Sequence, residues 1–394
     1  MDLDLNLDTE NKSEIKIFEK WDDMNLKENL LRGIYSHGFE DPSPIQKKAI
    51  IPIVKKNDVI AQAQSGTGKT GAFAISTLEL IDESLNDNQC IIMAPTRELA
   101  IQIKDVVSGI GSMLDNISIQ LLIGGRSIDK DIEDLKKKPK VIIGCPGRIH
   151  DMCKRRKINT KSIKLLILDE ADEMLSAGFK EQVYNIFHFL STDIQVCLFS
   201  ATLPTDVQQL SEKFMRNPIK ILVKAESLTL EGINQYYIAM EDDNSKFETL
   251  KDLFKCLSVN QTIIYCNSIK RVIDLTEALN TEGFSVSCIH SNMEKEERTS
   301  KYYDFKAGTT RILISTNLTA RGIDIQQVSI VINFDIPRDI HSYLHRIGRS
   351  GRWGRKGTGI NFITKRDIGQ IKEIEQYYST QIDELPASFV SYTD

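Results

Sequence analysis

The most constraining feature of the sequence is a regular alternation of short apolar runs with longer segments of helical pattern. Across residues 58–223 the short runs are DVIA, IIMAP, VIIGC, LLILDEAD and VCLFSAT, which are rich in β-branched residues. Apolar runs of this length are typical of strands covered on both faces, and helical segments between them are typical of parallel pairing. The pattern therefore predicts an α/β fold built on a doubly wound parallel sheet.

The same alternation begins again after the polar segment 225–232. The later runs are TIIYC, VSCIH, RILIST, VSIVINF and INFIT. A chain of 394 residues is also longer than one ordinary core requires. We therefore expect two tandem doubly wound domains, over residues 21–224 and 233–394, with 225–232 as the linker and 1–20 as a flexible acidic tail.

Composition excludes several classes of protein. The net charge of −5 argues against a wholly basic protein that coats nucleic acid, although it leaves room for a local basic groove. No apolar run approaches the roughly 20 residues of a membrane span, and the start MDLDLNLDTE lacks the pattern of a signal peptide. The seven scattered cysteines contain no CxxC pair, which favours buried free thiols. We expect a cytoplasmic protein without a membrane partner, with the nucleus as the alternative location.

A glycine-rich loop, AQSGTGKT at residues 63–70, follows the apolar run DVIA and precedes a helical segment. Backbone N–H groups of such a loop can surround phosphates at a helix N-terminus, and a lysine can reach the β- and γ-phosphates. A glycine-rich turn that binds nothing is the alternative, but strand, loop, Lys-Thr and helix coincide here. The sequence predicts an ATP site formed by Ser65, Gly66, Thr67, Gly68, Lys69 and Thr70.

An acidic motif, Asp169-Glu170-Ala171-Asp172, comes directly after the apolar run LLIL. Carboxylates at the carboxyl end of a parallel strand lie where such sheets bind ligands. An acidic helix start after a strand is common by itself, but here it accompanies a phosphate loop. We predict that Asp169, with Thr70, holds Mg²⁺ partly through water, and that Glu170 positions the water that attacks the γ-phosphate.

Together these motifs resemble the DEAD-box helicase family, and the resemblance extends from about residue 21 to 385. It implies that the two doubly wound domains are RecA-like. The segment GFxxPxxIQ at residues 38–46 resembles the Q-motif of the family. The resemblance implies that Gln46 recognises adenine, with Trp21 in place of the usual upstream Phe. A carboxamide suits that role, because it can donate to and accept from the polar edge of adenine.

The resemblance also implies residues that couple ATP hydrolysis to RNA. In the first domain these are Ser200 and Thr202 of Ser-Ala-Thr, together with Asp172. In the second domain the matching segment is HRIGRSGR. There the resemblance assigns Arg349 and Arg352 to the γ-phosphate as arginine fingers, and it assigns His345 and Arg346 to contacts that bridge to the first domain. Arg321 is assigned to the catalytic cleft and Asp324 to the ATP ribose. So dense a set of cations is expected to face either solvent or phosphate, because burying it without anions is costly.

A further group of motifs resembles the family's RNA-backbone contacts. Hydroxyls, helix N-termini and arginines bind phosphate without reading bases, so the contact is expected to be independent of sequence. The residues implied are Pro95, Thr96, Arg97, Gly125, Gly147, Arg148, Arg298 and Thr316. Three positions depart from the family's pattern, with Cys145 for Thr, Asn317 for Asp and Lys295 for Gln. The lysine- and arginine-rich runs 136–138 and 154–157 could contact RNA or act as targeting signals, but a solvated surface is the favoured interpretation.

The resemblance is greatest to the initiation factor 4A subfamily and implies an RNA-dependent ATPase and helicase with ATP, Mg²⁺ and RNA as its ligands. A role in translation initiation follows, as a monomer that binds an initiation-factor scaffold. The alternative is the nuclear paralogue, which acts in exon-junction assembly or ribosomal-RNA processing as an ATP-gated RNA clamp with exon-junction-type protein partners. A P-loop ATPase that remodels protein or duplex DNA is disfavoured by the full series of motifs.

Overall fold

The computed structural model describes residues 17–63, 67–176, 178–221, 233–256, 261–317, 328–350 and 357–386. The chain divides into two compact units, Met1–Lys224 and Ala225–Asp394. Most of the predicted tail and the whole predicted linker lie outside the described residues.

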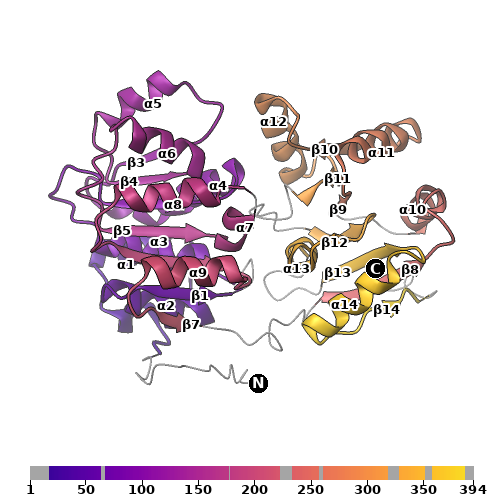
Figure 1. Cartoon of the computed structure of the whole chain (residues 1–394), viewed down its shortest axis with the longest axis horizontal. Helices are drawn as coiled ribbons and strands as arrows, with labels where there is room; N and C mark the ends of the chain where they lie inside the picture. Colours follow the sequence, from indigo (N-terminus) through magenta and orange to yellow (C-terminus); the bar gives the residue numbers. More distant parts are fainter. Residues whose placement is uncertain are drawn as a thin grey trace. The chain divides into compact units, whose positions relative to one another are not determined.

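The first unit contains a seven-stranded sheet in the order β3-β4-β2-β5-β6-β1-β7, with every neighbouring pair parallel (Figure 1). Successive strands are joined through helices, as parallel pairing requires. The strands are β1 (Val59–Gln62), β2 (Cys90–Met93), β3 (Ile119–Leu122), β4 (Val141–Gly144), β5 (Leu165–Asp169), β6 (Gln195–Ser200) and β7 (Ile219–Ile221).

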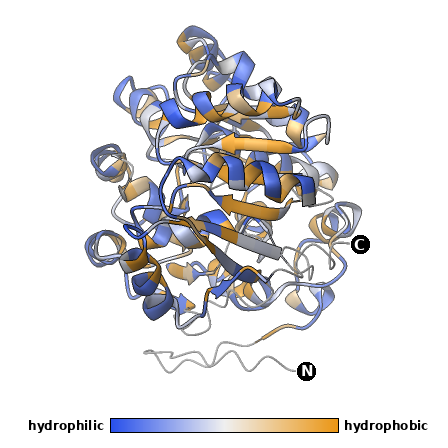
Figure 2. Ribbon diagram, turned by 90° about the vertical axis from the view of Figure 1, so that its right-hand side faces the viewer, coloured by the Kyte–Doolittle hydropathy of each residue, from blue (hydrophilic) through white to orange (hydrophobic). Residues whose placement is uncertain are grey.

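Helices cover both faces of this sheet. They are η1 (Trp21–Met24), α1 (Glu28–Ser36), α2 (Pro44–Val54), α3 (Lys69–Leu80), α4 (Arg97–Ile110), η2 (Gly111–Met113), α5 (Ile128–Leu135), α6 (Pro146–Lys154), α7 (Ala171–Ser176), α8 (Lys180–Phe189) and α9 (Thr205–Phe214). Every residue of β1, β2, β4, β5 and β6 is buried. In the hydropathy colouring of Figure 2, orange strands lie among helices that carry blue, hydrophilic stretches. The sheet is thus the apolar middle layer of three.

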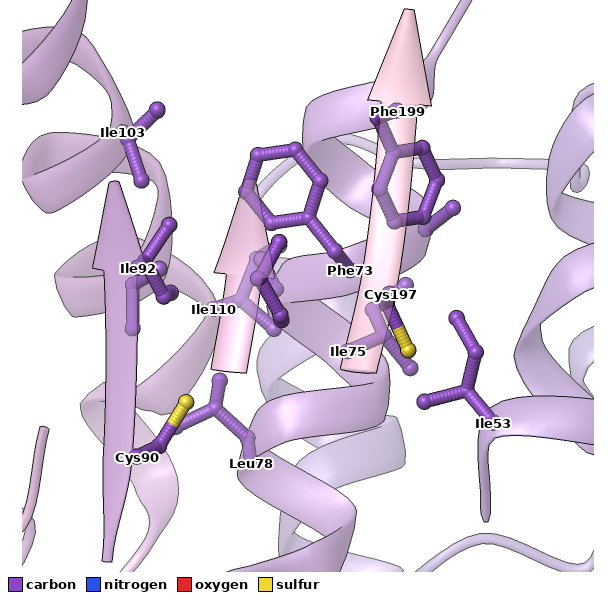
Figure 3. Close-up of a cluster of buried hydrophobic side chains, with 14 of the residues drawn as sticks. Ile53, Phe73, Ile75, Leu78, Cys90, Ile92, Ile103, Ile110, Cys197 and Phe199 are labelled. Carbon is purple, nitrogen blue, oxygen red and sulfur yellow. The ribbon is translucent and has the colours of Figure 1, made fainter. Parts of the chain in front are cut away.

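Two hydrophobic cores lie on opposite faces of the first sheet, because successive strand side chains point in opposite directions. Ile92 belongs to the core under α1 to α4, whereas its neighbours Ile91 and Met93 belong to the core under α6 to α9. Figure 3 shows the first core, where the rings of Phe73 and Phe199 meet edge to face with centroids 5.1 Å apart.

The second unit repeats the architecture with a parallel sheet in the order β10-β11-β9-β12-β13-β8-β14. Its strands are β8 (Ile233–Ala239), β9 (Gln261–Tyr265), β10 (Val286–Ile289), β11 (Ile312–Ser315), β12 (Val328–Asn333), β13 (Gly357–Ile363) and β14 (Asp383–Glu384). Its helices are α10 (Ser245–Cys256), α11 (Ile269–Thr281), α12 (Lys295–Lys306), α13 (Ile340–Ile347) and α14 (Ile368–Tyr378). The expected fold class, two tandem RecA-like parallel sheets, is confirmed.

Two expectations from the composition concern the cysteines and membrane-spanning helices. Cys90, Cys153, Cys197 and Cys266 are buried and free, and burial raises the pKa of the Cys90 thiol to about 12. Within the described parts of the chain, no helix is both long and apolar enough to cross a membrane.

Replacing Phe199 by Ala is expected to destabilise the first unit by about 3–5 kcal/mol, because a buried ring leaves a cavity that the sheet cannot close. A Trp353→Phe background leaves Trp21 of the first unit as the sole tryptophan of the chain's two, so its fluorescence during urea unfolding reports on that unit. The control is Phe189→Ala, whose ring is 38% exposed. Equal losses of unfolding free energy in both variants would contradict the packing described.

Candidate functional site

Three of the predicted motifs meet at the carboxyl edge of the first sheet, because their strands are neighbours in the order β5-β6-β1. Gln62 at the end of β1 pairs in register with Ser200 at the end of β6, and Asp169 at the end of β5 pairs with Phe199. The phosphate loop follows β1, the acidic motif begins at the end of β5, and Ser-Ala-Thr begins at the end of β6. The sheet therefore aligns the three segments on a single edge.

The phosphate loop and the acidic motif are joined by a buried ion pair. The Lys69 Nζ lies 3.2 Å from the Glu170 Oε1, and both side chains are almost fully buried. Lys69 is the first residue of α3, directly after Gly68, whose φ of 97° lies in the left-handed region. Ser65 and Gly66 lie outside the described residues. A cation is thus fixed at the N-terminus of α3, which is a favourable position for phosphate.

Asp169 presents a desolvated carboxylate beside this cation. Its Oδ1 accepts a hydrogen bond of 3.0 Å from the Glu170 N–H. Burial raises the pKa of Asp169, and the positive charge of Lys69 opposes that rise. A buried carboxylate and the Thr70 hydroxyl in the first turn of α3 are hard oxygen donors, which are the ligands that Mg²⁺ prefers. The residues present therefore fit the predicted metal.

The acidic motif is hydrogen-bonded to the Ser-Ala-Thr segment. Thr202 donates to the Asp172 Oδ2 through its hydroxyl at 2.6 Å and its N–H at 3.2 Å. The Asp172 N–H in turn donates to the Ser200 Oγ at 3.2 Å. A movement of the acidic motif would therefore change its hydrogen bonds with Ser200 and Thr202. The coupling role of these two residues stays a prediction.

Gln46 contacts the phosphate loop as well as its own helix. Its Oε1 accepts from the Ser43 N–H at 2.7 Å, and its Nε2 donates to the Gly68 carbonyl at 3.1 Å. Trp21 is buried and stacks on Phe39, with ring centroids 6.4 Å apart. The adenine contacts of Gln46 and Trp21 stay predictions. The bond from Gln46 to Gly68 was not foreseen from the sequence, because it joins residues 22 positions apart.

The predicted RNA residues of the first unit gather at two helix N-termini. α4 follows β2 and α6 follows β4, and these strands are neighbours, so Pro95, Thr96, Arg97 and Gly147 come to the same edge. Thr96 caps α4 by accepting from the Leu99 N–H at 3.2 Å. A Cβ added to Gly147 would meet no atom within 4 Å, so there is free space beside the first turn of α6. Gly125 follows β3, the neighbour of β4.

Arg148 is held by a partner that the motif pattern did not predict. Its Nη1 forms a short ion pair with the Asp131 carboxylate, and its Nη2 donates to the Arg126 carbonyl at 3.0 Å. Burial raises the pKa of Asp131, and the hydrogen bond from Arg148 opposes the rise. Arg148 thus fixes α5 against the start of α6, and its contact with RNA stays a prediction.

The expectation that the cations of HRIGRSGR face solvent or phosphate is wrong for Arg346. Its guanidinium is fully buried and is bound by neutral oxygens of the second unit. It donates to Asn317 (2.7 Å), Asn333 (3.1 Å), the Asp335 carbonyl (2.7 Å) and Asn267 (2.8 Å). Burial lowers the pKa of Arg346 to about 10. Amide and carbonyl oxygens satisfy the donors, which is how the cost of burial is offset.

Of the other residues predicted in the second unit, one group lies within the described residues and the other lies outside them. Arg298, His345 and Arg349 are buried, and Thr316 directly follows β11. Asn317, which departs from the family's pattern, accepts a hydrogen bond from the Arg346 guanidinium. Arg321, Asp324 and Arg352 lie outside the described residues.

A phosphate loop, an acidic motif and a Ser-Ala-Thr segment on neighbouring strand ends of a RecA-like unit define a P-loop ATPase. Residues 43–210 match the DEAD/DEAH box helicase family, and residues 245–354 match the helicase conserved C-terminal domain. The chain belongs to the DEAD-box helicase family.

Relatives and solved structures agree with this assignment. The chain is 54% identical to the ATP-dependent RNA helicase eIF4A of Scheffersomyces stipitis, covering 93% of this chain and 92% of the relative. It is 51% identical to eIF4A of Saccharomyces cerevisiae, with 95% of each covered. S. cerevisiae Dbp5 bound to RNA and ADP BeF3 superimposes with a TM-score of 0.88 at 33% identity, covering 95% of this chain and 98% of that one. Mss116p bound to ssRNA and AMP-PNP gives a TM-score of 0.84 at 28% identity, with 94% and 80% covered.

Gly68→Ala is expected to lower ATP affinity on the order of tenfold, because an added Cβ would lie 2.5 Å from the Ser43 Oγ and 2.9 Å from the Gln46 Nε2. Gly178→Ala is the control. Its φ of 84° is also positive, but no atom lies within 4 Å of the added Cβ. Titration with a fluorescent ATP analogue compares the two variants, and similar affinities would show that crowding at Gly68 does not matter to the site.

Proposed function

We propose that this chain is an ATP-dependent RNA helicase of translation initiation, which hydrolyses ATP when RNA binds and separates short RNA duplexes locally. The observation that carries the proposal is a series of contacts in two parts, joined by the backbone of the acidic motif, at the carboxyl edge of the first sheet. It runs from Lys69 to Glu170, and from Asp172 to Ser200 and Thr202. A series of this kind links the phosphate loop to the segment assigned to coupling.

In the proposed mechanism the phosphates of ATP compete with Glu170 for the ammonium of Lys69. Because the Lys69 Nζ is only 3.2 Å from Glu170, binding of a polyphosphate there draws the cation away from the carboxylate. Glu170 is then free to accept a hydrogen bond from the attacking water. Thr70 and Asp169 would hold Mg²⁺, which would supply positive charge to the phosphates. Gln46 and Trp21 select adenine.

RNA is proposed to bind through its backbone. In the first unit the N-termini of α4 and α6 offer N–H groups to phosphates, with Thr96, Arg97 and Gly125 beside them. In the second unit Arg298 and Thr316 are proposed to bind phosphates of the RNA backbone. Contacts of these kinds carry no base information, so the helicase acts on many sequences.

The second unit is proposed to supply charge to the reaction. Arg349 and Arg352 stabilise the γ-phosphate as it leaves, and Asp324 binds the ribose. His345, Arg346 and Arg321 couple this step to RNA. For Arg346 the route is indirect, because its guanidinium is occupied by Asn267, Asn317 and Asn333 and positions the ends of β9, β11 and β12.

The proposed setting is the cytoplasm, where the protein acts as a monomer with an initiation-factor scaffold. This setting is supported by relatives that carry the name eIF4A, and the nuclear clamp is not favoured. An ATP-gated clamp differs from a helicase in turnover, since a clamp retains RNA with little hydrolysis. Measuring ATP turnover with and without RNA, and strand separation of a short duplex, therefore tests the proposal.

Glu170→Gln is expected to lower the RNA-stimulated kcat by roughly a hundredfold or more while leaving ATP binding intact, because the neutral amide removes the negative charge that orients the attacking water. Steady-state phosphate release with saturating RNA measures the change, and Glu181→Gln, at an exposed position of α8, is the matched control. A Glu170→Gln enzyme with wild-type turnover would remove Glu170 from the reaction. A wild-type protein that RNA does not stimulate would contradict the proposed function itself.

A further inference from the structure

The positive charge of this acidic protein is concentrated in one stretch. Residues 136–164 contain eleven Lys and Arg residues and a single acidic residue, Asp151, although the whole chain has a net charge of −5. Only Arg148 of these cations is among the residues predicted above to bind RNA. The remaining ten have no role in the proposed mechanism.

The structure gathers most of these cations at the amino edge of the first sheet, opposite the edge that carries the ATP and RNA residues. α5 and α6 each return the chain from the carboxyl edge to the amino edge, so their last residues lie beside the beginnings of β4 and β5. β2 lies between those two strands. Figure 1 shows α5 and α6 beside β3 and β4.

Hydrogen bonds join the two basic segments through residues 87–89. The Asn88 Nδ2 donates to the Pro139 carbonyl at 2.6 Å, and the Asn88 Oδ1 accepts from the Asn159 N–H at 3.0 Å. The Gln89 N–H donates to the Lys140 carbonyl at 2.8 Å, and the Lys164 N–H donates to the Gln89 carbonyl at 2.8 Å. The segments that follow α5 and α6 are therefore neighbours in space.

Six of the cations at this edge are exposed and have no ion-pair partner among the residues that the structure describes. We call them the amino-edge basic surface: Lys136, Lys154, Arg156, Lys157, Lys161 and Lys164. Three neighbours are already paired, Lys137 with Asp134, Lys138 with Asp87 and Arg155 with Asp151.

The backbone beneath this surface is held in place. Ile158 and Ile163 lie within the loop after α6 and are 4% and 1% exposed, so they anchor it to the core. Arg156 takes a left-handed conformation with φ of 55°, and its N–H donates to the Cys153 carbonyl at the end of α6. Fixed backbone positions keep like charges close together, which favours a polyanion over dispersed counterions.

We infer that the amino-edge basic surface is a second RNA-binding site, which contacts the sugar-phosphate backbone and holds RNA independently of ATP. The inference rests on the proposed function for the presence of RNA as a substrate. An acidic protein partner is the other polyanion to consider, but protein interfaces are usually centred on apolar or aromatic side chains. The large exposed hydrophobic residues of the described chain all lie outside residues 136–164.

A second site would act by raising the local concentration of RNA. An RNA long enough to reach both edges of the sheet binds the two sites together, whereas a short RNA occupies only the track at the carboxyl edge. Because the surface lies within one unit and away from the phosphate loop, its contribution does not depend on bound nucleotide.

The test compares two full-length variants that remove the same amount of charge. The surface variant carries Lys154→Gln, Arg156→Gln, Lys157→Gln and Lys161→Gln. The control variant carries Lys55→Gln, Lys56→Gln, Lys365→Gln and Lys372→Gln, which are exposed lysines elsewhere on the chain. Thermal unfolding of both variants establishes that they fold, and fluorescence anisotropy measures binding of unstructured 40-nucleotide and 10-nucleotide RNAs.

The surface variant is expected to bind the 40-nucleotide RNA about tenfold more weakly than the control at low salt, with and without AMP-PNP. Its affinity for the 10-nucleotide RNA in AMP-PNP is expected to match that of the control. A plot of log affinity against log salt for the long RNA has a negative slope. The slope is expected to become shallower by about 0.7 for each phosphate group that the variant no longer neutralises.

Equal affinities of the two variants for the 40-nucleotide RNA would overturn the inference. So would selective loss of binding to poly-glutamate with RNA binding unchanged, because that result would identify an acidic protein site. These binding measurements require no ATP turnover. Their outcome is therefore independent of the RNA-stimulated ATPase assay, which tests the proposed function.

Discussion

The buried ion pair between Lys69 and Glu170 is the interaction on which the rest of the first unit's site depends. Removing one member of such a pair commonly costs about 3–5 kcal/mol, because the other charge is left buried and uncompensated. The pair can persist only if the ends of β1 and β5 keep their spacing, with β6 between them. A phosphate can replace Glu170 at Lys69 without leaving the ammonium unpaired. The ion pair is therefore a structural contact and, in the proposed mechanism, also the element that responds to nucleotide.

The two edges of the first sheet have different properties, and parallel topology is the reason. All strands end at the carboxyl edge, so buried carboxylates, the phosphate loop and the starts of α4 and α6 gather there. The helical connections between strands return the chain to the amino edge, where the exposed lysines after α5 and α6 lie. Chemistry requires desolvated, hydrogen-bonded groups, whereas a sequence-independent grip on RNA needs only exposed charge. One sheet provides both environments.

Much of the fold could be predicted because buried parallel strands leave a strong apolar signal. The strands that had no such signal lie at the sides of the sheets. β3 is only partly buried over its first two residues and contains Gln120, and β8 contains Asn234 and Gln235. The short β7 and β14 offer too few residues for a pattern.

The motif residues of the site could also be named, because phosphate loops and strand-end carboxylates have fixed local spacing. Their partners could not. Asp131 reaches Arg148, and Asn267 reaches Arg346 across 79 positions, through contacts that only the tertiary fold creates. The burial of Arg346 was missed for the same reason, since its cost is offset by amide oxygens distant in sequence.

The acidic motif is proposed to pass the state of the nucleotide site to the RNA site through the hydrogen bonds between Asp172 and Thr202. The most direct measurement is the RNA affinity of the wild type and of Thr202→Val, each with and without a nonhydrolysable ATP analogue. In the wild type the analogue should tighten RNA binding by about tenfold, within the usual range of coupling between sites. In Thr202→Val, which removes the 2.6 Å hydroxyl bond to Asp172 but keeps the side-chain shape, that tightening should be largely lost while affinity for the analogue itself is retained. An unchanged tightening in Thr202→Val would contradict the account.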